Sequence, residues 1–397
     1  MSAIKSILKK MRDLYIFTFA NITFKKPQYI QDSIIILRND AIGDYLLFRN
    51  FLHEIRDSYP KYKITLLGNV AWSELSLHFD KEIIDDFIFF NPQYLARKPL
   101  YAVHFLQTLK NKKYDIFINA VHSRDTTNFL LSRYINANSS FAPQGDYINT
   151  TQKTKIKNDK IYTKIYPSKK EILFEFYRNM EFCQNFLDKK LKTKLELDST
   201  KLIPFKSLQD KFKLQIPYSI LFIGASTAFR KWNVESFAQV GIHLIENYHQ
   251  NIVICGGKDD KENAEILQEI MQSTSKKYNK HIYNIVGITN LLELASVVYN
   301  GNHLISNETS CAHLGAILDT TITIVVSNGN HLGRFIPYPK ELRDKYYPVF
   351  HHFISNNPSK YEELSNAYAY KSTLDINEIT PHDVIKIIDL TLQKERK

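Results

Sequence analysis

The sequence predicts an α/β protein made of two successive doubly wound domains joined by an irregular linker. Short, wholly apolar runs alternate along the chain with helix-like segments, which is typical of repeated strand–helix–strand units. Continuous apolar runs indicate strands of a parallel sheet that is covered on both faces. The length of 397 residues suits two or three domains, at about 150 residues each. Ligands of such sheets bind at the carboxyl ends of the strands, so functional residues are sought in the loops that follow them.

The first domain is predicted to cover residues 1–212. It opens at the apolar run 34–37, which stops at Arg38 and leads through a polar loop into an apolar-periodic helix. The same order recurs and predicts strands at 63–68, 83–90 and 114–119, with a helix at 101–109. From residue 150 the chain becomes lysine-rich around a helix-like stretch at 171–187, and we interpret this region as the end of the domain and the linker.

The second domain is predicted to cover residues 213–397, where the strand–helix alternation restarts. Asn233 is suited to cap a helix that runs to about residue 248, and Thr380 followed by Pro381 is typical of a helix start. Strands are predicted at 220–224, 252–256, 303–306 and 321–326, an extended segment at 285–287, and further helices at 258–272, 291–298 and 311–318.

The composition favours a globular protein with an anionic partner. Hydrophobic residues make up 44% of the chain, which supports a large core. Lys and Arg number 52 against 41 Asp and Glu, and the net charge of +11 suits a nucleotide, a phosphorylated glycan, a membrane surface or a nucleic acid. Cys183, Cys255 and Cys311 have no paired spacing, so neither a disulfide framework nor a zinc site is predicted, in keeping with a reducing cytosol.

The first 24 residues combine cationic and apolar side chains. The apolar positions recur at spacings of three and four, as on one face of a helix. Two interpretations remain open: a basic amphipathic helix that lies on an anionic membrane surface, and a helix that packs on the domain. The apolar stretch 14–24 is too short to span a bilayer. The cationic residues are Lys5, Lys9, Lys10 and Arg12, and the apolar ones are Ile4, Ile7, Leu8, Met11, Leu14 and Tyr15.

Asp44 follows the first predicted strand and the flexible Gly43. A carboxylate at the carboxyl end of a strand is well placed for catalysis, and a neighbouring glycine lets a ligand approach the backbone. The same carboxylate is equally suited to support the N-terminus of the following helix. Both interpretations of Asp44 stay open at this point.

The strand-end loops of the second domain carry groups suited to a nucleoside diphosphate. The loop 225–232 offers hydroxyls and cations beside a helix start, which is a frequent phosphate site. The segment 307–313 repeats this geometry, and its histidine either donates to a phosphate oxygen or is an ordinary helix residue. Asp260 or Glu262, after two glycines, is placed to bind a ribose hydroxyl. The candidate residues of the two loops are Ser226, Thr227, Arg230, Lys231, Asn307, Glu308, Thr309, Ser310 and His313.

Known nucleotide and metal fingerprints are missing from the sequence. It contains no G-x-G-x-x-G, which argues against a dehydrogenase, and no G-x-x-x-x-G-K-[ST], which argues against a P-loop nucleoside triphosphatase. H-E-x-x-H and paired cysteines are also missing, so zinc hydrolysis has no support.

Three short segments of the chain, taken in order, carry a family resemblance. Residues 38–44, R-N-D-A-I-G-D, are similar to the opening R/K-x-S-x-x-G-D. Residues 224–226, G-A-S, with Lys231 and Trp232 are similar to G-A-S…K-x-W-P, and residues 307–316, N-E-T-S-C-A-H-L-G-A, to N-D-S-G-P-x-H-L-A-A. Together they resemble the heptosyltransferase-like glycosyltransferase family 9. The chain departs from that pattern at Arg230, Asn233, Glu308, Ser310, Cys311 and at residues 327–330, where the family has F-G-P-T.

The resemblance implies a GT-B fold of two facing Rossmann-like domains with a cleft between them. It implies inverting sugar transfer, with the donor on the second domain and the acceptor on the first. Asp44 then matches the proposed catalytic base, which takes the proton of the attacking hydroxyl, while Arg38 and Asn39 are assigned to the acceptor. Charge on the leaving diphosphate is met by side chains and helix N-termini, without an obligatory metal or cofactor.

The predicted function is therefore transfer of a heptose or related sugar from a nucleotide-diphosphate donor, with ADP-heptose as one candidate. The expected acceptor is an anionic glycolipid of the lipopolysaccharide core or another surface glycan. The expected place is the cytoplasm, in peripheral contact with the inner face of the cytoplasmic membrane, without a nucleic-acid partner. Two alternatives are a GT-B-type nucleotide-sugar epimerase and a non-enzymatic nucleic-acid-binding protein, the latter resting on the +11 charge and 13% aromatic residues.

Overall fold

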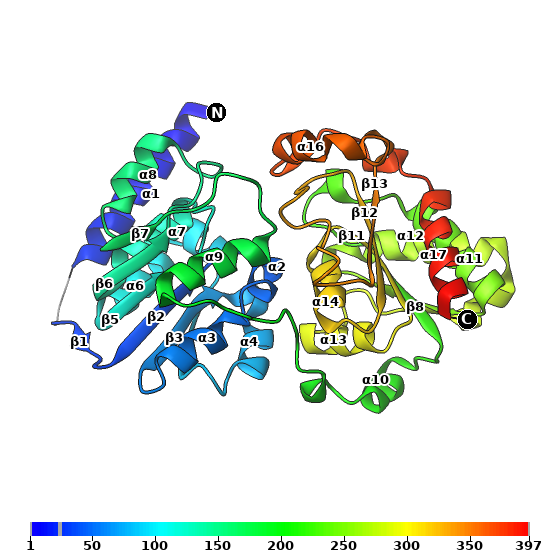
Figure 1. Cartoon of the computed structure of the whole chain (residues 1–397), viewed down its shortest axis with the longest axis horizontal. Helices are drawn as coiled ribbons and strands as arrows, with labels where there is room; N and C mark the ends of the chain where they lie inside the picture. The colour runs from blue at the N-terminus through cyan, green and yellow to red at the C-terminus, as the bar shows by residue number, and fades with distance from the viewer. Residues whose placement is uncertain (1, 23–25, 396–397) are drawn as a thin grey trace. The chain divides into compact units, whose positions relative to one another are not determined.

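The computed structural model describes residues 2–22 and 26–395, and these form two compact units (Figure 1). The first contains the chain up to Lys170 together with Phe176–Thr193, and the second contains Glu171–Glu175 together with the chain from Lys194 onward. Residues 194–212, expected in the first domain, thus belong to the second unit. The reason is a packed helix, α10 (Phe205–Phe212), whose Lys211 Nζ lies 2.5 Å from Glu293 Oε1 of the same unit.

The first unit is built on a parallel sheet with the strand order β4–β3–β2–β5–β6–β7, and β1 pairs with β5 as an additional strand. The predicted strands at 34–37, 63–68 and 114–119 are confirmed, whereas β6 and β7 were missed because neither is a continuous apolar run. The strands are β1 (Gln28–Tyr29), β2 (Ser33–Arg38), β3 (Lys63–Asn69), β4 (Asp86–Phe90), β5 (Lys112–Asn119), β6 (Asn136–Pro143) and β7 (Lys164–Tyr166).

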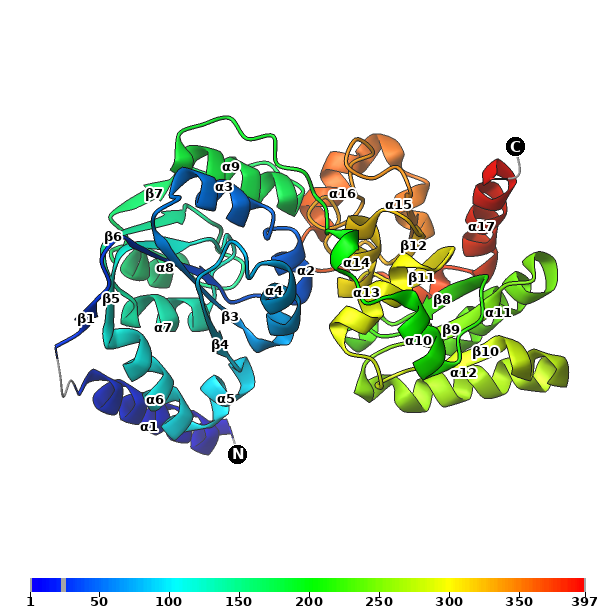
Figure 2. The ribbon, with the colours of Figure 1, turned by 90° about the horizontal axis from the view of Figure 1, so that it is seen from below.

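Helices cover both faces of this sheet, as Figure 2 shows. One face carries α3 (Phe51–Ser58), α4 (Ser73–Phe79) and α9 (Glu175–Leu187), and the other carries α6 (Pro99–Lys110), α7 (Thr126–Tyr134) and α8 (Gln152–Asp159). The first helix, α1 (Ser2–Asn21), lies along α6, with Ile16 and Ala20 buried in the core that α6 and α7 form on the sheet. The short helices are α2 (Ile42–Leu46) and α5 (Pro92–Arg97).

The second unit is a parallel sheet with the order β10–β9–β8–β11–β12–β13. The extended segment expected at 285–287 lies three residues earlier, at β10, and residues 286–288 instead form a turn in which Gly287 has a positive φ of 72°. The edge strand β13 was missed because it contains Pro348, which only an edge position tolerates. The strands are β8 (Tyr218–Phe222), β9 (Asn251–Cys255), β10 (Ile282–Asn284), β11 (His303–Asn307), β12 (Ile322–Ser327) and β13 (Tyr346–Phe350).

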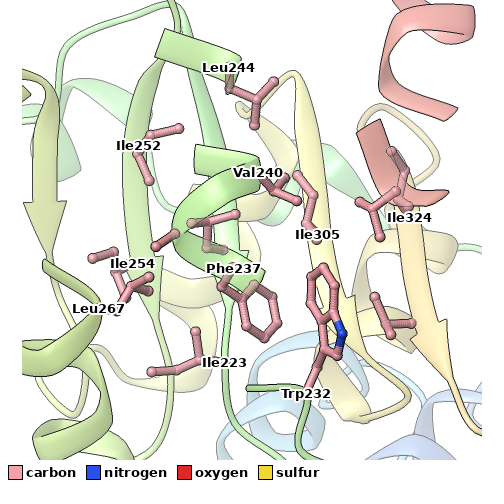
Figure 3. Packing of buried hydrophobic residues seen from close by; sticks show 14 of the residues in the cluster. Ile223, Trp232, Phe237, Val240, Leu244, Ile252, Ile254, Leu267, Ile305 and Ile324 are labelled. Atoms are coloured by element: carbon pink, nitrogen blue, oxygen red, sulfur yellow. The ribbon is translucent and has the colours of Figure 1, made fainter. Parts of the chain in front are cut away.

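The core of the second unit lies mainly between its sheet and the helices α11, α12 and α17. Figure 3 shows this core, where the ring of Trp232 meets Phe237 of α11 at a centroid distance of 5.0 Å, in one cluster with Ile305 and Ile254 of the sheet. The opposite face carries α13 and α14. The helices are α11 (Val234–Tyr248), α12 (Lys261–Thr274), α13 (Leu291–Tyr299), α14 (Ser310–Leu318), α15 (His352–Ser355), α16 (Tyr361–Tyr368) and α17 (Pro381–Glu395).

One sequence prediction about local structure is confirmed at the start of α11. The Asn233 side chain caps α11 by accepting a hydrogen bond from the Ser236 amide at 2.7 Å. Cys255, in a predicted apolar strand, is buried, as is Cys311 of α14. Burial raises the pKa of the Cys255 and Cys311 thiols, so both behave as small apolar core residues.

Candidate functional site

The polar loops of the second unit gather at one edge of its sheet. The strands β8, β11 and β12 are neighbours and parallel, so their carboxyl ends lie side by side. Three loops begin there: residues 223–233 after β8, residues 308–309 leading into α14, and residues 328–338 after β12. This is the edge at which ligands bind in open α/β sheets.

Asn307 ties the first two loops together. Its side-chain amide donates to the carbonyls of Ile223 and Gly224, at 3.0 and 3.2 Å, and its oxygen accepts from the Trp232 amide at 3.0 Å. The residue is fully buried, so the predicted ligand contact of Asn307 is replaced by a positioning role. Trp232 is fixed at its other end, because its indole donates to the carbonyl of Ile379 at 2.8 Å.

Arg230 is held against the start of α14. Its guanidinium donates to Oε2 of Glu308 at 2.5 Å, to the backbone carbonyl of Glu308, and to the Ser226 hydroxyl at 3.2 Å. Oε2 of Glu308 also lies 3.1 Å from Nδ1 of His331. Burial acts to raise the pKa of Glu308, but the charges of His331 and Arg230 and the histidine hydrogen bond together hold it below its usual value. The carboxylate is therefore ionised and has two cationic or potentially cationic neighbours.

Lys231 points to a different partner. Its Nζ lies 2.6 Å from Oδ1 of Asp260, whose other oxygen accepts from the Gly257 amide at 2.9 Å. Gly224 makes this approach feasible, since a Cβ there would lie 2.5 Å from Oδ2 of Asp260. Asp260 is buried and its carboxylate is used within the protein, so it secures the β8 loop rather than facing outward as predicted for a ribose ligand. Glu262 lies in the first turn of α12.

His313 lies in the second turn of α14 and is buried. Its Nδ1 is 2.7 Å from the hydroxyl of Tyr338, and its ring meets Phe335 edge-on. Burial lowers the pKa of His313 to about 4, so the ring is neutral at physiological pH. Burial also raises the pKa of Tyr338, so its hydroxyl keeps its proton. When that hydroxyl donates to Nδ1, the histidine proton is on Nε2, which makes Nε2 a donor for an oxygen ligand.

The remaining predicted groups of this edge are hydroxyls. Ser226 and Thr227 are exposed on the β8 loop. Thr309 caps α14 by accepting from the Cys311 amide at 3.3 Å, and Ser310 follows as the first residue of the helix, half-buried. The structure thus brings Ser226, Arg230, Glu308 and Thr309 together at the start of α14, whose N-terminus favours an anion.

His331 and Tyr338 were not among the predicted site residues. Both lie on the loop after β12, whose first residues depart from the F-G-P-T pattern of the family. His331 has a positive φ of 64°, an uncommon conformation for a residue with a side chain, and one that aims its ring at Glu308. The strand-end rule that located the other two loops applies equally to β12 and was sufficient to find this one.

The first unit carries the other predicted residues at the carboxyl end of β2. Asp44 lies in α2, half-buried, and its Oδ2 accepts from the Ala41 amide at 3.3 Å, so the carboxylate supports the helix start. Arg38 is fully buried rather than presented to an acceptor: it donates to the Ala120 carbonyl at 2.6 Å and to the Asp44 carbonyl at 3.3 Å. Arg38 therefore positions the loop that holds Asp44.

Asn39 is part of a hydrogen-bonded network behind that loop. Its amide oxygen accepts from Asn128 at 2.5 Å, and its nitrogen lies 3.4 Å from Asp125. Asn128 is also bonded to Asn119 at the end of β5. The half-buried Asn39 links the β2 and β5 strand ends and keeps part of its surface accessible.

Across residues 2–22 and 26–395, one group of histidine and acidic side chains has ligand atoms close enough for a metal ion, namely His351, His352 and Glu378. Hydrogen bonding explains the geometry of this group. His351 caps α15 by accepting from the Phe353 amide on Nδ1, so its proton is on Nε2, which lies 2.9 Å from Glu378. A metal on Nε2 would displace that proton and the cap, so the group is better explained as a structural contact.

A family model for "Glycosyltransferase family 9 (heptosyltransferase)" matches residues 102–327, which is more than half of the chain. The chain belongs to glycosyltransferase family 9. The resemblance drawn from the three segments is thereby confirmed, and the protein is a glycosyltransferase. No curated protein matches the chain in sequence.

Solved structures of similar fold support the GT-B architecture of this family 9 member. A glycosyl transferase family 9 protein from Veillonella parvula DSM 2008 has a TM-score of 0.66 at 16% identity, covering 91% of this chain and 97% of its own. E. coli ADP-heptose lps heptosyltransferase II has a TM-score of 0.63 at 14% identity, covering 92% and 100%. E. coli heptosyltransferase WaaC with ADP-2-deoxy-2-fluoro heptose has a TM-score of 0.63 at 16% identity, covering 90% and 99%. At these identities the likeness shows the fold.

Proposed function

We propose that this family 9 enzyme transfers a heptose or related sugar, with inversion, from a nucleotide-diphosphate donor to a surface-glycan acceptor. The observation that carries the donor assignment is the cluster of Arg230, Glu308, Thr309 and the neutral His313 at the N-terminus of α14. A guanidinium, hydroxyls and a helix N-terminus suit a diphosphate. ADP-heptose is the first donor to test, because family membership supports heptosyl transfer and E. coli WaaC is known in complex with ADP-2-deoxy-2-fluoro heptose.

Arg230 is the proposed principal diphosphate ligand. Its guanidinium already forms an ion pair with the Glu308 carboxylate, so a diphosphate would compete with that carboxylate for the guanidinium. A dianionic, geometrically matched group is the stronger partner for the planar fork. Glu308 would then accept a hydrogen bond from a sugar or ribose hydroxyl while it keeps its contact with Nδ1 of His331. Thus the two departures from the family pattern, Arg230 and Glu308, act as one exchangeable pair.

His313 and the start of α14 are proposed to stabilise the leaving group. Negative charge grows on the diphosphate as its bond to the sugar breaks, and donors fixed in advance stabilise that charge most in the transition state. Nε2 of His313 is such a donor, because Tyr338 orients the neutral ring through Nδ1. The proposal places the compensating charge on Arg230 and the helix N-terminus and includes no resident metal.

Asp44 is the proposed general base. As the acceptor hydroxyl attacks the anomeric carbon, a new C–O bond forms, the bond to the diphosphate oxygen breaks, and the hydroxyl proton goes to the Asp44 carboxylate. A single displacement of this kind inverts the anomeric configuration. Arg38 supports the step indirectly, because its guanidinium holds the backbone carbonyl of Asp44.

The proposed acceptor is an anionic glycolipid of the lipopolysaccharide core or a related surface glycan, met at the inner face of the cytoplasmic membrane. The net charge of +11 supports an anionic acceptor. No helix in the described parts of the chain is both long and apolar enough to cross a membrane. The membrane contact that we propose is peripheral.

The donor assignment is tested by a thermal-shift screen of nucleoside diphosphates and nucleotide sugars, followed by calorimetry on each hit. A ligand at about 100 times its Kd stabilises a protein by about 2.7 kcal/mol, which is readily measured. We expect ADP-sugars to raise the melting temperature and UDP-sugars to do so less. Stabilisation by no nucleoside diphosphate would contradict the proposed donor class.

A further inference from the structure

The helix α1 presents an apolar stripe that the first unit leaves uncovered. Met11, Leu14 and Phe17 expose 63%, 65% and 62% of their surface. Ile16 and Ala20 of the same helix are buried against the unit. At about 100° per residue, Met11 lies about 180° around the helix from Ala20, and Leu14 about 160° from Ile16. The helix therefore buries one side and turns a second apolar side away.

The rotation of α1 is fixed by contacts with its own unit. Gln107 of α6 donates to the Phe19 carbonyl at 2.9 Å, and Lys110 donates to the Asn21 carbonyl at 2.8 Å. Arg12 donates to the carbonyl of Ala96 at the end of α5. The helix is thus attached at two places along its length, and the stripe of Met11, Leu14 and Phe17 is a fixed surface.

Met11, Leu14 and Tyr15 are the described end of the apolar series that the sequence predicts on one face of the N-terminal helix. The helix packs on the domain through Ile16, Ala20 and the partly buried Tyr15, whereas Met11 and Leu14 of the predicted face are turned outward. Exposed apolar side chains of this kind do not stabilise the packing of the helix on its unit. An exposed apolar face instead indicates a surface that binds a partner.

The charge of α1 decides which partner fits. Four cationic residues, Lys5, Lys9, Lys10 and Arg12, stand against one acidic residue, Asp13, within Ser2–Asn21, which gives 4 − 1 = +3. Arg97 and Lys98 add exposed cations at the end of α5, where Arg12 is bound. A second copy of the same helix would bring like charges together, whereas an anionic lipid surface meets both the charge and the apolar side chains.

We propose that the outer face of α1, centred on Met11, Leu14 and Phe17, docks the enzyme on anionic phospholipid headgroups with its axis in the plane of the interface. This inference gives a surface to the membrane contact of the proposed function, but it does not depend on the identity of donor or acceptor. Each apolar side chain that enters the interface adds hydrophobic stabilisation, and the cations add an attraction that salt weakens.

The test measures sedimentation of the full chain with phosphatidylcholine vesicles that contain phosphatidylglycerol, without donor or acceptor. The variant Met11→Glu/Leu14→Glu is compared with Ile266→Glu/Leu390→Glu, which places the same charges at exposed apolar positions of α12 and α17. We expect the α1 variant to bind at least about tenfold more weakly and the control to bind like the parent chain. If both variants lose vesicle binding equally, the change in net charge explains the loss, and α1 is not the docking face.

Two further arms separate the alternatives. Lys9→Gln/Lys10→Gln should weaken binding to anionic vesicles while leaving the weak binding to pure phosphatidylcholine unchanged. Light scattering of the same proteins tests a second copy as the partner: a parent dimer that Met11→Glu/Leu14→Glu converts to monomer, with no vesicle binding by the parent, would refute the proposal. Diphosphate affinity of the α1 variant, expected to match the parent, shows that the chain is folded and keeps this test independent of the catalytic one.

Discussion

The guanidinium of Arg230 has two competing partners in the proposed reaction, the Glu308 carboxylate and the donor diphosphate. We expect Arg230→Ala to raise the Kd for the nucleoside diphosphate by about tenfold to a hundredfold, since a charge-assisted contact contributes about 1.5–3 kcal/mol. Lys231→Ala should raise this Kd less, because Lys231 is paired with Asp260 on the other side of the loop. Calorimetry on the folded variants measures both, and an unchanged Kd in Arg230→Ala would place the donor elsewhere.

Glu308→Gln examines the other half of this pair. The neutral amide releases Arg230 from a charged partner, so diphosphate affinity should be kept or slightly raised. Sugar selectivity should change, because the amide presents a donor as well as an acceptor to the sugar or ribose hydroxyls. Comparing transfer from several nucleotide sugars by parent and variant measures this change, and an identical preference in both would exclude Glu308 from sugar recognition.

Asp44→Asn separates catalysis from support of the loop. An asparagine oxygen can still accept from the Ala41 amide, so the start of α2 should persist. The amide cannot take the proton of an acceptor hydroxyl, so transfer should fall by roughly a hundredfold or more. Donor affinity should match the parent. Wild-type turnover in Asp44→Asn, measured as nucleoside diphosphate release, would rule out its role as base.

At the residue scale, the sequence located loops more reliably than it assigned roles. Arg230 and Glu308 were both predicted in the site, but their mutual pairing depends on rotamers that no pattern records. Arg38 and Asn307 match family segments, yet both are fully buried and hold loops in place. Tyr338 had no signal of its own, since its role comes from a contact with His313 across 25 residues of chain.

At the scale of elements, Asn307 joins the β8 and β11 loops, and this predicts a stability effect. Asn307→Ala removes three hydrogen bonds and leaves the Trp232 amide without its acceptor in the core. We expect the free energy of unfolding to fall by about 3 kcal/mol, at about 1 kcal/mol for each hydrogen bond. Urea unfolding monitored by tryptophan fluorescence measures it. Asn302→Ala, at an exposed position before β11, is the matched control and should stay within about 0.5 kcal/mol of the parent chain.

The same scale explains which elements the sequence predicted. The strands β2, β3, β9 and β12 are buried along their whole length or nearly so, and this burial requires the continuous apolar runs that reveal them. The strand β6, N-A-N-S-S-F-A-P, is only partly buried, so its residues carry no such pattern. Its place in the sheet is set by pairing with β5, which is tertiary information.

At the scale of the whole molecule, two α/β units could be predicted but their boundary could not. The chain leaves the first unit at residue 170, contributes Glu171–Glu175 to the second, and returns at Phe176. Those five residues are secured by the Glu175 amide, which donates to the Arg334 carbonyl at 2.7 Å, and by the Phe174 ring beside Tyr338. From composition alone this region is interpreted as a lysine-rich linker. That the chain passes to the second unit for five residues and back is determined by tertiary contacts, which the residue types do not reveal.

Burial shifts the pKa of two histidines of the second unit, His303 and His313, and this shift predicts how the stability of the unit depends on pH. Burial lowers the pKa of both His303 and His313 to about 4, from an ordinary value of 6.5. Above pH 6.5 both rings are neutral in the folded and unfolded chain, so the full stability is present. As the pH falls from 6.5 towards 4, the unfolded chain takes up protons that the folded chain refuses, and stability is lost. At pH 5 each histidine should lower the free energy of unfolding by about 2 kcal/mol relative to neutral pH.

His303→Gln provides the test, because His303 lies at the start of β11, away from the candidate site, and its Nε2 contacts Thr391 at 3.3 Å. Urea unfolding of the second unit between pH 7 and 5 should show a smaller loss in this variant than in the parent, by about 2 kcal/mol. His382→Gln, on the exposed surface of α17, should leave the parent profile unchanged. If His303→Gln keeps the full pH dependence, the loss of stability between pH 7 and 5 arises from other groups. Carboxylates such as Glu308, whose pKa is lowered, lose their contribution to stability only at pH values below their ordinary range. The pH window therefore distinguishes the buried histidines from the acidic group at the donor site.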